Sequence, residues 1–130
     1  MDQRPILVID DDPGIRRAVM ELLDDAGYPT LTAETAGEAL DLAAADKPIA
    51  AIVDLNLTGG VSGYEVIFRL RERLGTELGI VVLSGRTATA DRTASLAIGA
   101  DEYIAKPYDA DELLASVARA IQRRRDAASR

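Results

Sequence analysis

The chain has 130 residues, of which 48% are hydrophobic and 28% charged, a composition typical of one globular domain with its own core. Its formal net charge of −7 disfavours nonspecific binding to nucleic acid, because a phosphate backbone would repel it. Cysteine and histidine are both absent, which excludes disulfides, thiolate metal sites and histidine bases, so any bound metal must be held by oxygen atoms.

No apolar run approaches the ~20 residues that cross a bilayer. The first residues, MDQRP, lead directly into an expected strand and lack the basic and apolar segments of a signal peptide. Together with the absence of cysteine, this favours a cytoplasmic protein without membrane contact.

Short β-branched runs alternate five times with amphipathic segments along the chain. This alternation predicts an α/β fold, a doubly wound parallel sheet of five strands with helices on both faces. In chain order, the expected elements are strand 5–9, helix 13–26, strand 29–33, helix 36–45, strand 49–53, helix 63–74, strand 80–83, helix 88–98, strand 102–105 and helix 110–125.

Residue types at the expected helix starts support these boundaries. Asp12, Thr35 and Asp109 each precede a helical pattern and are favourable N-cap residues. We therefore expect one domain over residues 1–125, followed by a flexible tail over residues 126–130.

Polar side chains stand where four of the expected strands end. Asp10 and Asp11 follow the first strand, Asp54 the third, Ser84 the fourth and Lys106 the fifth. The carboxyl ends of parallel strands open onto one crevice, so we expect these side chains to meet. Carboxylates held so close repel by several kcal/mol at an effective dielectric of ~20. A bound cation relieves the repulsion, and Mg²⁺ fits best because it takes oxygen ligands.

Four segments, ILVIDDDPGIR, IVDLNL, VVLSG and GADEYIAKPYDADEL, resemble in their order and spacing the receiver domain of bacterial response regulators. These domains are the phosphoacceptor half of two-component systems, and the resemblance covers about Ile6 to Arg123. It implies a flavodoxin-like sheet in the strand order 2-1-3-4-5 with five helices, as in chemotaxis regulators. It also implies that phosphorylation switches the surface formed by residues 88–98, 102–105 and 110–125 to control a partner or output domain.

The resemblance assigns roles to individual residues of the acidic pocket. Asp54 would be the phosphoacceptor and, with Asp10, Asp11 and the backbone carbonyl of Asn56, would bind Mg²⁺. Asp11 would contact the metal directly, and Asp10 would act through water. An aspartate carboxylate can attack phosphorus and form an acyl phosphate.

Other residues would sense the phosphoryl group in the resemblance. Ser84 would donate a hydrogen bond to it, Lys106 would pair with it, and the bond from Lys106 to Pro107 would be cis. Tyr103 would be the aromatic residue that moves inward when Ser84 shifts. At the rim, Gly85 leaves access to the phosphoryl oxygen.

Arg86, two residues after Ser84, has two readings. It is either a solvated loop residue or a rim residue that tunes the lifetime of the phosphorylated state. The loop 57–63 is one residue longer and richer in glycine than is usual for the family, which makes it more flexible.

Because the chain lacks histidine, its phosphoryl group must come from a histidine kinase, a histidine phosphotransfer protein or a small phosphodonor. In that case the chain catalyses its own aspartyl phosphorylation and slow dephosphorylation, and is not a conventional enzyme. Its target is either a separate protein or an output domain, without direct nucleic-acid contact.

A phosphorylation-dependent dimer stays open, although Ser116 offers no salt-bridge partner. The four arginines of the last helix, residues 119, 123, 124 and 125, suit the helix dipole better than nucleic acid.

Three alternatives remain. A flavodoxin-like flavin-binding protein would need a phosphate loop rich in serine, threonine and glycine, where this chain has Asp10, Asp11 and Asp12. A phosphatase with an aspartate nucleophile usually needs an acid two residues later, and Asn56 is a poor one. The third alternative is a degenerate receiver that is not phosphorylated and acts as an interaction module.

Overall fold

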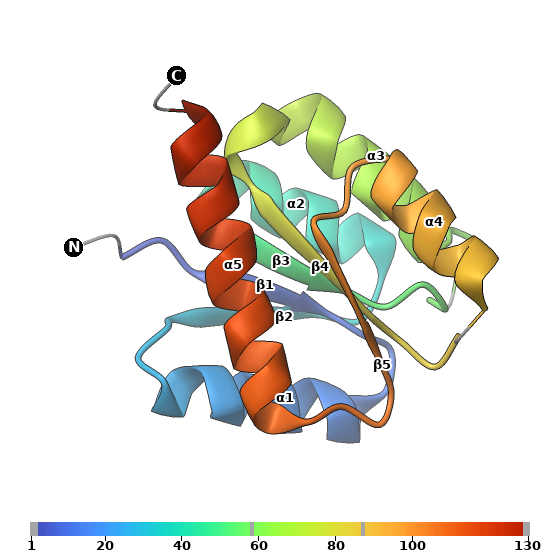
Figure 1. The fold of residues 1–130 in the computed structure, drawn as a ribbon, viewed down its shortest axis with the longest axis horizontal. Coiled ribbons are helices and arrows are strands. Elements are labelled where there is room, and N and C mark those ends of the chain that lie inside the picture. The colour runs from blue at the N-terminus through green and yellow to red at the C-terminus, as the bar shows by residue number, and fades with distance from the viewer. Residues whose placement is uncertain (1–2, 58, 87, 129–130) are drawn as a thin grey trace.

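A computed structural model describes residues 3–57, 59–86 and 88–128. It contains a sheet of five strands in the order β2-β1-β3-β4-β5, and every neighbouring pair is parallel. The strands are β1 (Ile6–Ile9), β2 (Thr30–Ala33), β3 (Ala50–Val53), β4 (Gly79–Ser84) and β5 (Glu102–Ala105). Figure 1 shows the central strands enclosed between helices, so the expected fold class and strand order are confirmed.

Helices cover both faces of the sheet. On one face lie α1 (Pro13–Asp25) and α5 (Ala110–Ala128), and on the other α2 (Ala36–Asp46), α3 (Gly63–Leu74) and α4 (Thr89–Ala97). A short 3₁₀ helix, η1 (Gly75–Glu77), links α3 to β4. Among the described residues, no helix has both the length and the apolar character that crossing a bilayer requires.

The first strand shows why the core has two layers. Ile6 and Val8 pack in the cluster shared with α1 and α5, whereas Leu7 and Ile9 pack in the cluster shared with α2 and α3. All four residues are buried. Parallel strands covered on both faces have no polar side, which explains the continuous apolar runs in the sequence.

The helix starts expected from the sequence are confirmed by side-chain capping. Asp12 accepts hydrogen bonds from the amides that follow it, at 2.9 Å from Gly14. Thr35 accepts from the amide of Glu38, and Asp109 accepts from the third amide after it in the same way. These caps satisfy amides that would otherwise have no partner at a helix start.

The last helix is longer than predicted. α5 continues to Ala128, three residues beyond the predicted end at residue 125, and so includes the first three residues of the expected tail. The Nε2 of Gln122 donates to Asp126 across one turn, at 2.8 Å, and the following alanines are strong helix formers. The rest of the expected tail, residues 129 and 130, lies outside the described residues, as does Thr58 of the loop before α3.

Helix α3 begins in direct contact with the main chain that carries Asp54. A Cβ atom on Gly63 would lie 2.2 Å from the carbonyl oxygen of Asp54 and 2.6 Å from the Cα of Leu55. The amide of Gly63 donates to the carbonyl of Leu55, at 3.0 Å. Only glycine allows this approach, because the obstructing atoms belong to the backbone and cannot rotate away.

We therefore expect Gly63→Ala to lower the free energy of unfolding by ~1–3 kcal/mol, the usual cost of forcing an extra group into a packed site. Urea unfolding of the two proteins measures the difference. Gly37→Ala on α2 is the matched control, since nothing lies within 4 Å of its added Cβ. The control should be neutral or stabilise the helix by up to about 1 kcal/mol. Equal losses in the two variants would contradict the role given to Gly63.

Candidate functional site

The predicted site residues come together at the carboxyl ends of four adjacent strands. Asp10 and Asp11 follow β1, Asp54 follows β3, Ser84 ends β4 and Lys106 follows β5. These strands are neighbours in the sheet, whereas β2 lies at its edge and supplies none of these residues. The order of the strands thus brings residues from the whole length of the chain into one place.

Three carboxylates form the centre of the site. Asp10, Asp11 and Asp54 each present an oxygen atom within 4.8 Å of the others. Asp10 and Asp54 are only 3% and 4% exposed, so solvent does little to separate their charges. Asp11 makes no hydrogen bond or ion pair with any other described residue. A set of hard oxygen donors with one unengaged carboxylate is the kind that Mg²⁺ prefers.

Lys106 joins two of these carboxylates. Its Nζ donates to Asp10 at 2.8 Å and to Asp54 at 3.3 Å. Burial pulls the pKa of Lys106 down, but the bonds and charges of Asp10 and Asp54 outweigh it and hold that pKa above its ordinary value. The ammonium is therefore charged at neutral pH. The peptide bond between Lys106 and Pro107 is cis.

Asp54 carries a residual electrostatic cost. Burial raises its pKa most, and the nearby charge of Asp10 raises it further. The amide of Asn56, 3.1 Å away, and the ammonium of Lys106 act in the opposite direction without cancelling the rise. Because the folded-state pKa is raised, stability falls as the pH rises above the unfolded-state pKa of Asp54, and the loss is complete above the folded-state pKa. A cation beside it would offset this cost.

Ser84 and Tyr103 meet the loop between β4 and α4 at the same residue, Arg86. Ser84 is fully buried, and its Oγ accepts from the Arg86 amide at 3.1 Å. Tyr103 is 8% exposed, and its hydroxyl donates to the carbonyl oxygen of Arg86. The tyrosine side chain is therefore buried and bound to this loop.

Arg86 is engaged through its side chain as well. Its Nε and Nη2 donate to the Oδ1 of Asn56, at 2.9 and 2.7 Å. Its Nη1 lies 3.4 Å from the Oδ1 of Asp91, which also accepts from the hydroxyl of Tyr64. The reading of Arg86 as a solvated loop residue is thus incomplete. Gly85 next to it is exposed, with nothing within 4 Å of a Cβ built there, so the rim is open at that point.

Tyr64 and Asp91 are the two contact residues that the sequence did not reveal. They lie 27 positions apart, on α3 and at the start of α4, and neither ends a strand. The one available signal was an acidic residue in the first turn of α4, which is equally well explained by the helix dipole.

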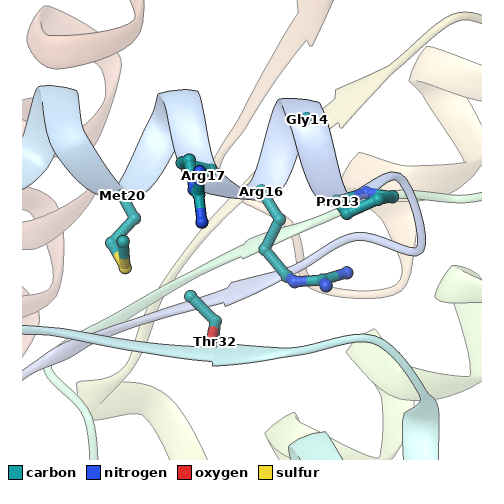
Figure 2. A pocket seen from close by; sticks show the side chains of 6 residues that line it. All are labelled: Pro13, Gly14, Arg16, Arg17, Met20 and Thr32. Carbon is teal, nitrogen blue, oxygen red and sulfur yellow. The ribbon is translucent and has the colours of Figure 1, made fainter.

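A separate hollow of about 460 Å³ lies between α1 and β2 (Figure 2), lined by Pro13, Gly14, Arg16, Arg17, Met20 and Thr32. None of the predicted site residues lines it. Its lining is linked to the site by a hydrogen bond from the Nη1 of Arg16 to the carbonyl of Asp10, at 2.8 Å.

The arginines of α5 bind acidic residues at the opposite end of the sheet. Arg124 lies 2.6 Å from Asp101, and Arg119 lies 2.8 Å from Glu102. Arg71 of α3 lies 3.0 Å from the same Asp101, whose side chain is almost fully buried. Burial, and then the neighbouring charge of Arg124, lower the pKa of Arg71 to about 10. These arginines therefore have acidic partners within the domain.

Comparison with known proteins identifies the family of the chain. The family model "Response regulator receiver domain" matches residues 6–118. The transcriptional regulatory protein KdpE of Mycobacterium tuberculosis is 42% identical over 123 residues, which are 95% of this chain and 53% of KdpE. The chain thus spans about half the length of the curated relatives that it matches.

Solved structures share the fold over nearly the whole chain. A CheY-like receiver domain protein from Methanospirillum hungatei JF-1 superposes with a TM-score of 0.88 at 26% identity, covering 96% of this chain and 98% of that one. A response regulator protein from Burkholderia pseudomallei, solved with a phosphorylated aspartic acid, a calcium ion and citrate, gives 0.82 at 33% identity and covers 96% and 73%. The family match, the strand order and the carboxylate cluster lead to one conclusion: the chain belongs to the response regulator receiver domains of two-component systems.

Proposed function

We propose that the chain receives a phosphoryl group on Asp54 in a Mg²⁺-dependent reaction and that this event switches the α4-β5-α5 surface. The contact of Lys106 with both Asp10 and Asp54, beside the unengaged Asp11, carries the proposal. It puts a nucleophilic carboxylate, a fixed positive charge and oxygen ligands for a metal in one crevice.

The chemistry is the transfer of a phosphoryl group from a donor to the carboxylate of Asp54. An oxygen of Asp54 forms a bond to phosphorus while the bond from phosphorus to the donor breaks, and the donor leaves with the electron pair. Asp10, Asp11, Asp54 and the backbone carbonyl of Asn56 would hold Mg²⁺, which neutralises charge on the phosphoryl oxygens. Lys106 supplies a second positive charge, and Ser84 a hydroxyl, so no acid–base residue is needed.

The switch would start at Ser84. A phosphoryl group adds a charge of about −2 and draws hydrogen-bond donors toward itself. Ser84 is bound to the amide of Arg86, and the carbonyl of Arg86 is bound to Tyr103. A shift of Ser84 would therefore alter the hydrogen bond that ties β5 to the loop before α4.

The donor in this proposal is a histidine kinase or a histidine phosphotransfer protein, with small phosphodonors as substitutes. The relative KdpE is named a transcriptional regulatory protein, which supports control of an output domain or a separate downstream protein. The net charge of −7 argues that this domain itself does not contact nucleic acid. Pairing of two copies after phosphorylation is compatible with the proposal but is not required by it.

Incubation with acetyl phosphate and Mg²⁺ tests the proposal directly. The intact mass of the wild-type protein should rise by one phosphoryl group, and Asp54→Asn should show no such rise. Asp41→Asn, which removes an exposed carboxylate from α2, should behave as the wild type. A wild-type protein that is folded and binds Mg²⁺ but gains no phosphoryl mass would refute the proposal.

Mg²⁺ should also stabilise the fold, because it binds the folded carboxylate cluster and not the unfolded chain. At a concentration 100-fold above its dissociation constant, the gain is about 2.7 kcal/mol. Thermal unfolding with and without chelator measures the gain. Asp11→Asn should lose most of it, whereas Asp41→Asn should keep it. An equal gain in the two variants would place the cation elsewhere.

Tyr103→Phe should leave phosphorylation of Asp54 intact but weaken its effect on the switch surface. The variant keeps the ring and loses only the hydroxyl that binds the Arg86 carbonyl. Hydrogen exchange of α4 and β5, measured before and after phosphorylation, should change less than in the wild type. An undiminished change would show that the hydroxyl takes no part in the coupling.

A further inference from the structure

A continuous chain of side chains runs along the rim of the acidic site. The hydroxyl of Tyr64 on α3 donates to the carboxylate of Asp91 at 2.5 Å. The same carboxylate oxygen lies 3.4 Å from the Nη1 of Arg86, and Arg86 donates twice to Asn56. We call these four residues, Tyr64, Asp91, Arg86 and Asn56, the rim chain.

One end of the rim chain is anchored in the packed structure. Asp91 lies in the first turn of α4, and its carbonyl accepts from the Oγ of Ser95, which is fully buried, at 2.8 Å. The hydrogen bond from Tyr64 lowers the pKa of Asp91 most, and Arg86 lowers it further, so the carboxylate stays charged. The side chain of Arg86 is itself 43% exposed, so without Asp91 its guanidinium would be held only by Asn56 among the described residues.

The other end of the rim chain reaches the phosphoacceptor. The amide of Asn56 donates to Asp54 at 3.1 Å, while the side chain of Asn56 holds the guanidinium of Arg86. The amide of Arg86 is bound to Ser84 at 3.1 Å. Arg86 is therefore attached to both sides of the crevice, to the loop after β3 and to the end of β4.

We infer that Asp91 and Tyr64 are positioning residues, which hold the guanidinium of Arg86 across the rim and so set how long Asp54 stays phosphorylated. The inference rests on the proposed phosphorylation of Asp54. Neither residue touches the reacting atoms, and each acts through Arg86.

The physical basis is access of water to phosphorus. In hydrolysis, a water oxygen forms a bond to phosphorus while the bond between phosphorus and the Asp54 oxygen breaks. The electron pair returns to the carboxylate, and the proton of the water passes to solvent. A guanidinium fixed at the rim leaves less space for that water to reach phosphorus. Without Asp91, Arg86 keeps one side-chain partner, Asn56, and its exposed side chain can swing away.

The test measures the lifetime of the phosphoryl group after the phosphodonor is removed, by intact mass over time. Asp91→Asn should shorten the lifetime about two- to fivefold, in keeping with the modest strength of exposed charge pairs. Tyr64→Phe should shorten it less. Asp41→Asn and Tyr28→Phe are matched controls, since neither residue belongs to the rim chain, and both should keep the wild-type lifetime.

Double variants separate positioning from a general effect on the fold. In the Arg86→Ala background, Asp91→Asn should cause no further change in lifetime, because its target is gone. NMR exchange of the Arg86 Nε proton gives a second readout. It should be slow in the wild type and faster in Asp91→Asn, with the unfolding midpoint nearly unchanged.

Two outcomes overturn the inference alone: equal lifetimes in Asp91→Asn and the wild type, or an undiminished effect of Asp91→Asn in the Arg86→Ala background. A wild-type protein that accepts no phosphoryl group overturns the proposed function first and this inference with it. The two failures are therefore distinguishable in one set of measurements.

Discussion

The ammonium of Lys106 lies between two buried carboxylates, and the remainder of the site depends on it. It binds Asp10, which lies 96 positions earlier in the chain, and Asp54, which lies 52 positions earlier. Without that charge, Asp10 and Asp54 would face each other with little solvent between them. The crevice is held in a state of incomplete neutralisation: three carboxylates share one ammonium, and the pKa of Asp54 stays raised. In the proposed function, a metal ion would offset this excess of negative charge.

Charge is organised differently at the two ends of the sheet. At the carboxyl ends of the strands, negative charge exceeds positive charge within the crevice. At the opposite end, Asp101 is paired with Arg71 and Arg124, so the buried charge there is fully compensated. These ion pairs tie α3 and α5 to the start of β5. The two ends of the sheet thus differ: Asp101 has two cationic partners, whereas three carboxylates share one ammonium in the crevice.

The sequence was sufficient for the fold because each local signal agreed with the next. Apolar runs without a polar side indicated buried parallel strands, and Asp12, Thr35 and Asp109 marked helix starts. Asp10, Asp11, Asp54, Ser84 and Lys106 could be grouped because a parallel sheet puts all its strand ends on one side. The end of α5 was misplaced because a basic run followed by Asp126 resembles a fraying terminus, while the bond from Gln122 extends the helix.

Tyr64 and Asp91 could not be found in the same way. Their contact depends on how closely α3 and α4 approach each other, which no periodicity in either segment encodes. The engagement of Arg86 with Asn56 has the same origin, since the loops after β3 and β4 meet only once the two strands are paired. The partners of the α5 arginines likewise follow from the position of β5 beneath that helix and not from the helix dipole.

The edge strand β2 differs from the other four strands because it supplies none of the site residues, although it lies beside β1. The turn from β2 into α2 passes through Glu34, which is exposed and whose amide donates to the carboxylate of Glu38 on the following helix. A label on this turn can therefore report on the site without contacting its residues. A fluorescent dye attached there would share the rigid body of the sheet while leaving the acidic crevice and the switch surface untouched.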